Sequence, residues 1–165
     1  MRHSRLLEAT KDIFYPFMSS GEWKVGSDPY ALGGHVGFRV HDVGNQAYVE
    51  PYIPWNHHFL VEGRVAFIAI DPLMPMTFRV ETNYCSIEVG YDQHGSVKDY
   101  AINTVPNRLQ ECDITQALIS LTDGAPLEAG DRLGIGVSRQ AGQNTDALFL
   151  GARIRYDTPI YARAP

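Results

Sequence analysis

Hydrophobic and polar residues alternate with a period of two along most of the chain. The alternation is clearest in residues 36–40, 76–80, 87–91, 133–137 and 148–156. This spacing puts one row of side chains on the buried face of a β-strand and the other row on solvent or on a neighbouring element. Weaker versions of the pattern occupy residues 13–17, 22–25, 46–53, 97–104 and 108–111. The pattern therefore predicts a chain made almost entirely of short strands.

Residues 64–70 depart from the alternation because apolar residues fill both their odd and their even positions. A strand of this composition is covered on both faces and lies in the middle of a sheet. Short runs rich in glycine, proline, asparagine and aspartate separate the strands and favour tight turns. These runs are residues 33–34, 43–45, 71–72, 92–95 and 129–131.

One segment has helical spacing instead. Its apolar residues recur at intervals of three and four, and they are Ile114, Ala117, Leu118 and Leu121. Asp113 precedes them as an N-cap residue, and Gln116 three residues later completes a capping-box pattern. We therefore predict one short helix, at about residues 113–121, that crosses between two sheets.

Many short strands with a single short helix indicate an all-β fold, an antiparallel two-sheet sandwich. A length of 165 residues suits one domain. We place the sandwich at residues 31–157, an N-terminal arm with edge strands at 1–30, and a C-terminal arm at 158–165. The expected core residues are Phe38, Val65, Phe67, Phe78, Val80, Ile87, Val89, Ile135, Val137, Leu150 and Ile154.

The charge and the apolar stretches argue against some partners. The net charge is −5 and no run of lysine and arginine interrupts it, so we expect no nucleic-acid surface. The longest strongly apolar stretch, residues 65–70, is far too short to span a membrane. The first residues lack the apolar core of a signal peptide, so we expect synthesis in a cytoplasm. Cys85 and Cys112 are expected as reduced, buried thiols, with a bridge between them as the alternative.

The second half of the chain carries an ordered set of features. They are a strand ending in an acidic residue at 109–113, an amphipathic turn at 114–121, the sequence AGDRLGIGVSR at 129–139, a polar loop at 140–146, and the strand ALFLGARIRY at 147–156. In the first half, residues 47–54 are followed by the apolar strand 65–70.

This order of features resembles the jelly-roll modules of bacteriophage virion proteins, which include capsid decoration proteins, head fibres and tail-associated proteins. The resemblance extends over residues 36–156. It implies a jelly-roll virion structural protein, a capsid decoration (cement) or fibre-type subunit located in the virion. It also implies a homo-oligomer, expected as a homotrimer, in contact with a major capsid or tail protein. These motifs mark an architecture and carry no chemistry.

The sequence offers no convincing catalytic or metal site. His57 and His58 are adjacent, so on a strand they would point to opposite faces and could not join Glu62 around one metal ion. Ser138 lies in no nucleophile-elbow context. We therefore expect no catalytic residues, no cofactor and no metal. A cupin-like metalloenzyme is the third hypothesis.

Five residues are candidates for an interface or a ligand site. Gly134 and Gly136 lie on the same face of a strand. Because neither residue has a side chain, the opposite sheet or another subunit can approach closely there. Tyr48 and Tyr52 share a strand face, and Trp55 follows nearby. Such aromatic residues build cores and interfaces, and they can also stack on sugar rings. The alternative hypothesis is therefore a non-catalytic carbohydrate-binding (receptor-binding) jelly-roll module that binds a surface glycan.

Overall fold

Ten strands and one short helix make up the described part of the chain. The computed structural model describes residues 7–17, 29–32, 34–54, 59–70, 75–85, 94–119 and 130–160. The strands are β1 (Leu7–Pro16), β2 (Pro29–Leu32), β3 (His35–Val40), β4 (Gln46–Val49), β5 (Phe59–Ala69), β6 (Met76–Cys85), β7 (His94–Ile102), β8 (Leu109–Asp113), β9 (Arg132–Ser138) and β10 (Ala147–Ile160). The helix α1 (Thr115–Ile119) lies between β8 and β9 in the sequence.

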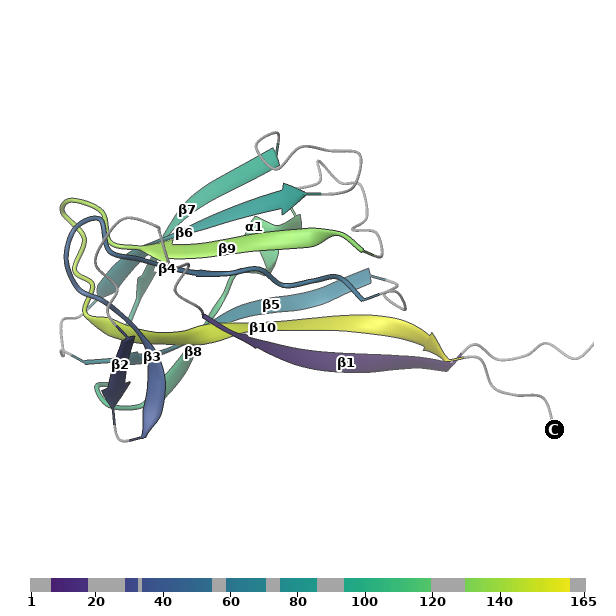
Figure 1. The fold of residues 1–165 in the computed structure, drawn as a ribbon, viewed down its shortest axis with the longest axis horizontal. Helices are drawn as coiled ribbons and strands as arrows, with labels where there is room; N and C mark the ends of the chain where they lie inside the picture. The colour runs from purple at the N-terminus through teal and green to yellow at the C-terminus, as the bar shows by residue number, and fades with distance from the viewer. Residues whose placement is uncertain are drawn as a thin grey trace, which may run out of the picture.

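The strands form two sheets that lie one over the other (Figure 1). The larger sheet has the order β2-β3-β10-β5-β8, with β1 paired to the far half of β10, and the smaller sheet has the order β4-β9-β6-β7. The paired strands run antiparallel. If β3 to β10 are lettered B to I, the two sheets read B-I-D-G and C-H-E-F, which is the strand order of a jelly roll. The predicted fold class is therefore confirmed: the chain is an all-β antiparallel jelly-roll sandwich with one short helix.

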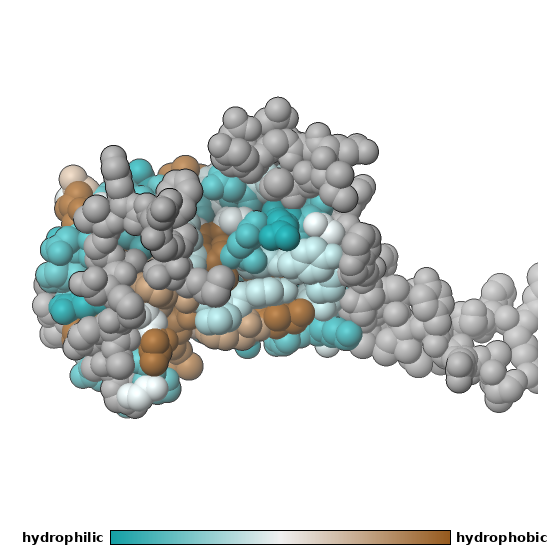
Figure 2. Space-filling view, viewed as in Figure 1, coloured by the Kyte–Doolittle hydropathy of each residue, from teal (hydrophilic) through white to brown (hydrophobic). Residues whose placement is uncertain are grey.

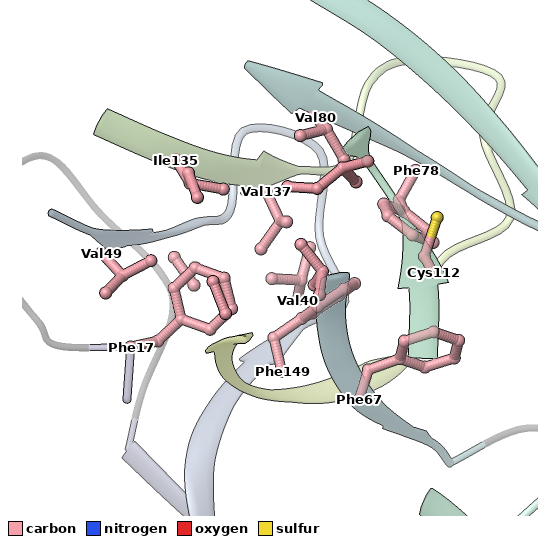
Figure 3. Packing of buried hydrophobic residues seen from close by; sticks show 14 of the residues in the cluster. Phe17, Val40, Val49, Phe67, Phe78, Val80, Cys112, Ile135, Val137 and Phe149 are labelled. Atoms are coloured by element: carbon pink, nitrogen blue, oxygen red, sulfur yellow. The ribbon is translucent and has the colours of Figure 1, made fainter. Parts of the chain in front are cut away.

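Three phenylalanine rings form the centre of the core between the sheets (Figure 3). Phe67 of β5 and Phe149 of β10 come from the larger sheet, and Phe78 of β6 comes from the smaller one; all three are fully buried. The ring centroids of Phe78 and Phe149 lie 5.1 Å apart, and those of Phe67 and Phe149 lie 5.7 Å apart. The Phe78–Phe149 contact joins the two sheets edge-on, an arrangement that aromatic rings prefer, and the tilted Phe67–Phe149 pair lies within the larger sheet.

The period-two pattern identified the buried positions well. The predicted core residues that are buried are Phe38, Val65, Phe67, Phe78, Val80, Ile135, Val137 and Ile154. In β5, every residue from 65 to 69 is buried, which confirms a central strand covered on both faces. On the face that Figure 2 views, hydrophilic and hydrophobic residues lie side by side.

The prediction for Leu150 was wrong, because this side chain is only half-buried. The register between β10 and β5 shifts between Phe149 and Gly151, so Leu150 is the additional residue of a β-bulge. The bulge returns Ala152 and Ile154 to the buried face. The alternation of apolar residues continues through 148–156 without a break, so the sequence alone could not reveal this shift in register.

The helix forms at the predicted place but is shorter in the described residues, where it covers Thr115–Ile119. Its predicted cap is confirmed, since the amide of Thr115 donates a hydrogen bond of 2.9 Å to Oδ1 of Asp113. Hydrogen bonds from the Thr115 hydroxyl and amide lower the pKa of Asp113 below its ordinary value. On the inner side, Leu118 packs against Gly63 of β5, where an added Cβ would lie 2.3 Å from Leu118 Cδ1.

We expect Asp113→Ala to lower the free energy of unfolding by about 1 kcal/mol, because the helix loses its N-cap acceptor. Asp113→Asn keeps an acceptor oxygen and should cost less. The lowered pKa makes the carboxylate's contribution complete above the ordinary value of 3.8, and the contribution is lost as the pH falls through the lowered value. Urea titrations of both variants at pH 7 and pH 3 measure this. Equal losses for Asp113→Ala at the two pH values would contradict it.

Strand ends and turns differ from the prediction in detail. Residues 46–53 form two pieces, since β4 ends at Val49 and a single bridge then joins Tyr52 to Arg132. The glycines at three predicted turns have positive φ angles, namely Gly34, Gly44 and Gly130. The two segments predicted as arms contribute to the larger sheet, because β1 pairs residue by residue with β10 as far as Ile160.

Several predictions fall on residues outside the described ones. They are the strands at 22–25 and 87–91, the core residues Ile87 and Val89, and the side chains of Trp55, His57, His58 and Cys85. Cys112 is a free, buried thiol, as predicted, and burial raises its pKa to about 12. No helix in the described part of the chain is long and apolar enough to cross a membrane.

Candidate functional site

The outer side of the smaller sheet collects four of the five residues predicted as an interface or ligand site. Tyr48 on β4 lies opposite Gly136 on β9, and Tyr52 bridges to Arg132 at the start of β9. Gly134 lies between these two positions on β9. We call Tyr48, Tyr52, Arg132, Gly134 and Gly136 the tyrosine–glycine face. Trp55 lies outside the described residues.

Tyr48 occupies the space over Gly136. A Cβ added at Gly136 would lie 2.6 Å from Cε1 and 2.9 Å from Cδ1 of Tyr48, so the ring rests against the bare glycine backbone. The close approach expected at Gly136 is therefore made by a neighbour in the same sheet and not by the opposite sheet. The hydroxyl of Tyr48 is hydrogen-bonded to Oε1 of Gln46. Burial, and then the charge of Glu81, raise the pKa of Tyr48.

Gly134 has a different environment. The nearest atom to a Cβ added there is Cβ of Asn83, at 3.5 Å, which is an ordinary van der Waals contact. The position is half-exposed and its backbone angle is not in the left-handed region. A side chain at Gly134 would therefore extend away from the sheet without disturbing the fold.

Two ion pairs lie beside this face. Arg79 on β6 makes two hydrogen bonds to Asp99 on β7, of 2.8 and 3.1 Å, and Arg132 lies 3.3 Å from Glu50. The row that begins with Tyr48 and Gly136 ends across the sheet at Val97, whose side chain is 61% exposed. The result is a surface with a tyrosine ring, an exposed valine and two compensated ion pairs, and Glu81 lies in the same row between Gly136 and Val97.

A second site lies on the side of the sandwich where the edge strands β7 and β8 face each other and α1 crosses between the sheets. It is a pocket of about 450 Å³. Its lining includes Glu62 of β5, Lys98 and Tyr100 of β7, Arg155 of β10, and Asp113 and Gln116 beside the helix. The sequence pattern indicated Asp113 and Gln116 as helix caps, and it gave Glu62 no convincing site. No local pattern marks the pocket, because it is assembled from strands that are far apart in the chain.

Two polar atoms of the pocket residues lack partners. Tyr100 Oη and Arg155 Nε are buried and make no hydrogen bond to any described residue. Burial raises the pKa of Tyr100 to about 12, so its hydroxyl is protonated at neutral pH. The ring of Tyr100 stacks on Phe78, with centroids 6.1 Å apart, and the ammonium of Lys98 lies 5.3 Å from the centroid of the Tyr100 ring.

The other side chains in the described part of the molecule form no third site. Among the described residues, no group of three or more histidine, cysteine, aspartate or glutamate side chains could hold a metal ion. Ser138 is buried and its hydroxyl accepts a hydrogen bond of 2.9 Å from Nε2 of Gln140. His41 lies 3.3 Å from Asp146, in a polar cluster that ties β3 to the loop before β10.

Comparison with known proteins finds solved structures that share little sequence with the chain and superpose on it with low TM-scores. No protein-family model and no curated protein matches the chain. Tripeptidyl peptidase 2 is 11% identical, with a TM-score of 0.48, over 78% of this chain and 9% of the peptidase. The exo-β-1,3-galactanase of Phanerochaete chrysosporium with galactose is 14% identical, with a TM-score of 0.40, over 92% of this chain and 27% of the galactanase.

A virus structure is also similar. The Desmodium yellow mottle tymovirus structure is 9% identical, with a TM-score of 0.38, over 100% of this chain and 95% of that chain. The chain thus spans only a small part of the peptidase and of the galactanase, and most of the tymovirus chain. Identities and TM-scores at this level assign neither a family nor a function.

Proposed function

We propose that the chain is a virion structural protein, a capsid decoration or fibre-type jelly-roll subunit of a phage particle. It acts as a homo-oligomer, expected as a trimer, that also contacts a capsid or tail protein. The observation that carries the proposal is the tyrosine–glycine face, where an open Gly134 lies beside a tyrosine ring that covers Gly136. The resemblance of residues 36–156 to phage virion modules supports the choice of partner.

The face has the physical properties of a contact surface. Tyrosine contributes a large contact area and is enriched at interfaces. A bare glycine allows another backbone to approach closely. The pairs Arg79–Asp99 and Arg132–Glu50 already compensate their charges, so a partner can cover them without leaving an isolated charge. A closed cyclic assembly uses such a face on every copy and avoids open-ended polymerisation.

The decisive experiment measures the molar mass of the protein and of the variant Gly134→Lys at tens of micromolar. We expect the unchanged protein to be oligomeric. Gly134→Lys places a charged chain in the interface, and we expect the dissociation constant to rise by about a hundredfold or more. Its thermal unfolding under monomeric conditions should match that of the unchanged monomer, because a Cβ at Gly134 makes no clash.

Val43→Lys is the matched control, since this valine is exposed on a turn outside the face. It should leave the molar mass unchanged. Two results would contradict the proposal: a monomeric unchanged protein that also fails to bind phage shells or tails from its own source, or an unaltered oligomer in Gly134→Lys.

A second candidate function is favoured by the geometry of Tyr48. Its ring rests on the Gly136 backbone, with Tyr52 farther along the same face. Flat aromatic surfaces of this kind can stack on the apolar side of a sugar ring. Binding to a glycan array that is lost in Tyr48→Ala, from a protein that is monomeric, would place the carbohydrate-binding module ahead of the virion subunit.

A further inference from the structure

The pocket beneath α1 has unused hydrogen-bonding capacity, which distinguishes it from the tyrosine–glycine face. It uses the inner side of β7, whereas that face uses the outer side of β4 and β9. Its volume of about 450 Å³ lies within the range of small-molecule sites. Nothing in the proposed structural role requires such a pocket, and the two can be tested separately.

The capacity consists of hydrogen-bond donors. Arg155 Nε and Tyr100 Oη are buried without partners among the described residues, and leaving a buried donor unpaired costs free energy. Lys98 adds an ammonium, whose contact within the described structure is the ring of Tyr100. Both atoms belong to side chains that line the pocket, so a group that enters it can pair with them once the atoms that cover them give way.

The acceptors of the pocket are already engaged. Glu62 lies 3.5 Å from Nη1 of Arg155 and also pairs with Arg64. Asp113 accepts the hydrogen bond from the Thr115 amide. The groups of the lining that remain unpaired are therefore donors, and a ligand that supplies an acceptor complements them.

The aromatic ring of the pocket is not available for stacking. Phe78 covers the ring of Tyr100 at an interplanar angle of 21°, and Lys98 lies over it as well. A neutral sugar, which is commonly held by stacking on a free aromatic face, therefore gains little here. The hydroxyl edge of Tyr100, the nitrogen donors and the side-chain amide of Gln116 remain to recognise a ligand.

We propose that this pocket binds a small carboxylate-bearing ligand, whose oxygens accept hydrogen bonds from Arg155, Tyr100 and Lys98. The Glu62 carboxylate orients the guanidinium of Arg155 through its other nitrogen. The carboxylate can belong to a free organic acid or to an acidic monosaccharide, since both present the same group. The bound state satisfies two donors that are unpaired in the free protein.

Calorimetric titration of the full chain with succinate, glucuronate and glucose tests the proposal. We expect both carboxylates to bind at millimolar concentration or below, and glucose not to bind. Tighter binding of glucuronate than of succinate assigns an acidic sugar, and the reverse order assigns a free acid. Equal binding of glucose and glucuronate, or no binding of either carboxylate, overturns the proposal.

Conservative variants identify the site. Tyr100→Phe keeps the stacking on Phe78 and removes the hydroxyl, while Arg155→Lys keeps the charge and removes Nε. Each should weaken carboxylate binding by about tenfold, the effect of losing one hydrogen bond to a charged group. In the free protein, Tyr100→Phe should not lower the unfolding temperature, because the lost hydroxyl had no partner.

Arg153→Lys is the matched control. Arg153 lies on the same strand but pairs with Glu111 at 2.8 Å, outside the pocket lining, so its replacement should leave binding unchanged. If Tyr100→Phe and Arg155→Lys bind succinate and glucuronate as tightly as the unchanged protein does, the carboxylate site is not in this pocket.

Discussion

Replacing Phe149 with alanine is expected to lower the free energy of unfolding by about 3–5 kcal/mol, the range for removing a fully buried phenylalanine ring. The Phe149 ring contacts those of Phe17, Phe67 and Phe78, with centroids 6.4, 5.7 and 5.1 Å away. These partners belong to both sheets, so the surrounding structure cannot close around the cavity without moving one sheet relative to the other. A domain of this size is marginally stable, and the variant should be largely unfolded at moderate urea concentration.

Urea titration followed by circular dichroism measures this loss, and Phe14→Ala is the matched control. Phe14 lies on the outer side of β1 and its side chain is 49% exposed, so its removal creates no internal cavity. We expect that variant to lose about 1 kcal/mol or less. If the two alanine variants were equally stable, the packing shown in Figure 3 would not describe the core.

The core could be predicted from the sequence because one local property determines it. In a strand, alternate side chains point to opposite faces, so the apolar positions of 76–80 and 133–137 identify the buried side without knowledge of any partner. The same reasoning failed at Leu150, where the register shift next to Gly151 depends on the neighbouring strand. A Cβ at Gly151 would lie 2.3 Å from the backbone oxygen of Tyr15, and only the paired structure reveals that contact.

The tyrosine–glycine face could be predicted in part. Its residues were identified because glycine in a strand and clustered tyrosines each need an explanation. That Tyr48 lies on Gly136 depends on the register between β4 and β9, which the alternation leaves undetermined. The sequence therefore indicated the residues and the structure supplied their pairing.

The pocket beneath α1 could not be predicted at all. Tyr100 and Arg155 lie on β7 and β10, which belong to different sheets, and the helix α1 lies beside both β5 and β7. Each residue looks unremarkable within its own strand. They line one pocket only because the folded chain brings these strands together, and that is a property of the tertiary structure.

The second large loss of stability is expected at Asp146, a buried aspartate that is bound to an arginine. Arg39 of β3 donates two hydrogen bonds of 2.9 Å to the carboxylate of Asp146, whose side chain is 9% exposed. The backbone carbonyl of Asp146 also accepts a hydrogen bond of 2.9 Å from the amide of Ile70. The residue thus holds the loop before β10 against β3 and β5.

We expect Asp146→Ala to lower the free energy of unfolding by about 3 kcal/mol, since it removes two charge-assisted hydrogen bonds that a buried carboxylate accepts. Asp99→Ala is a close control, because Asp99 accepts the same pair of hydrogen bonds from Arg79 but is 52% exposed. Water and salt screen that pair, so its loss should cost about 1 kcal/mol or less.

Urea titrations of both variants at low and at high salt separate burial from bonding geometry. The cost of Asp99→Ala should shrink further at 1 M salt, where screening acts within about 3 Å, while the cost of Asp146→Ala should hardly change. The Arg79 side chain also lowers the pKa of Asp99, so the contribution of that exposed pair should fade as the pH falls below the ordinary aspartate value. If the two replacements lower the free energy of unfolding equally and respond equally to salt, burial does not strengthen the Arg39–Asp146 pair. The loop before β10 must then be held by its other hydrogen bonds.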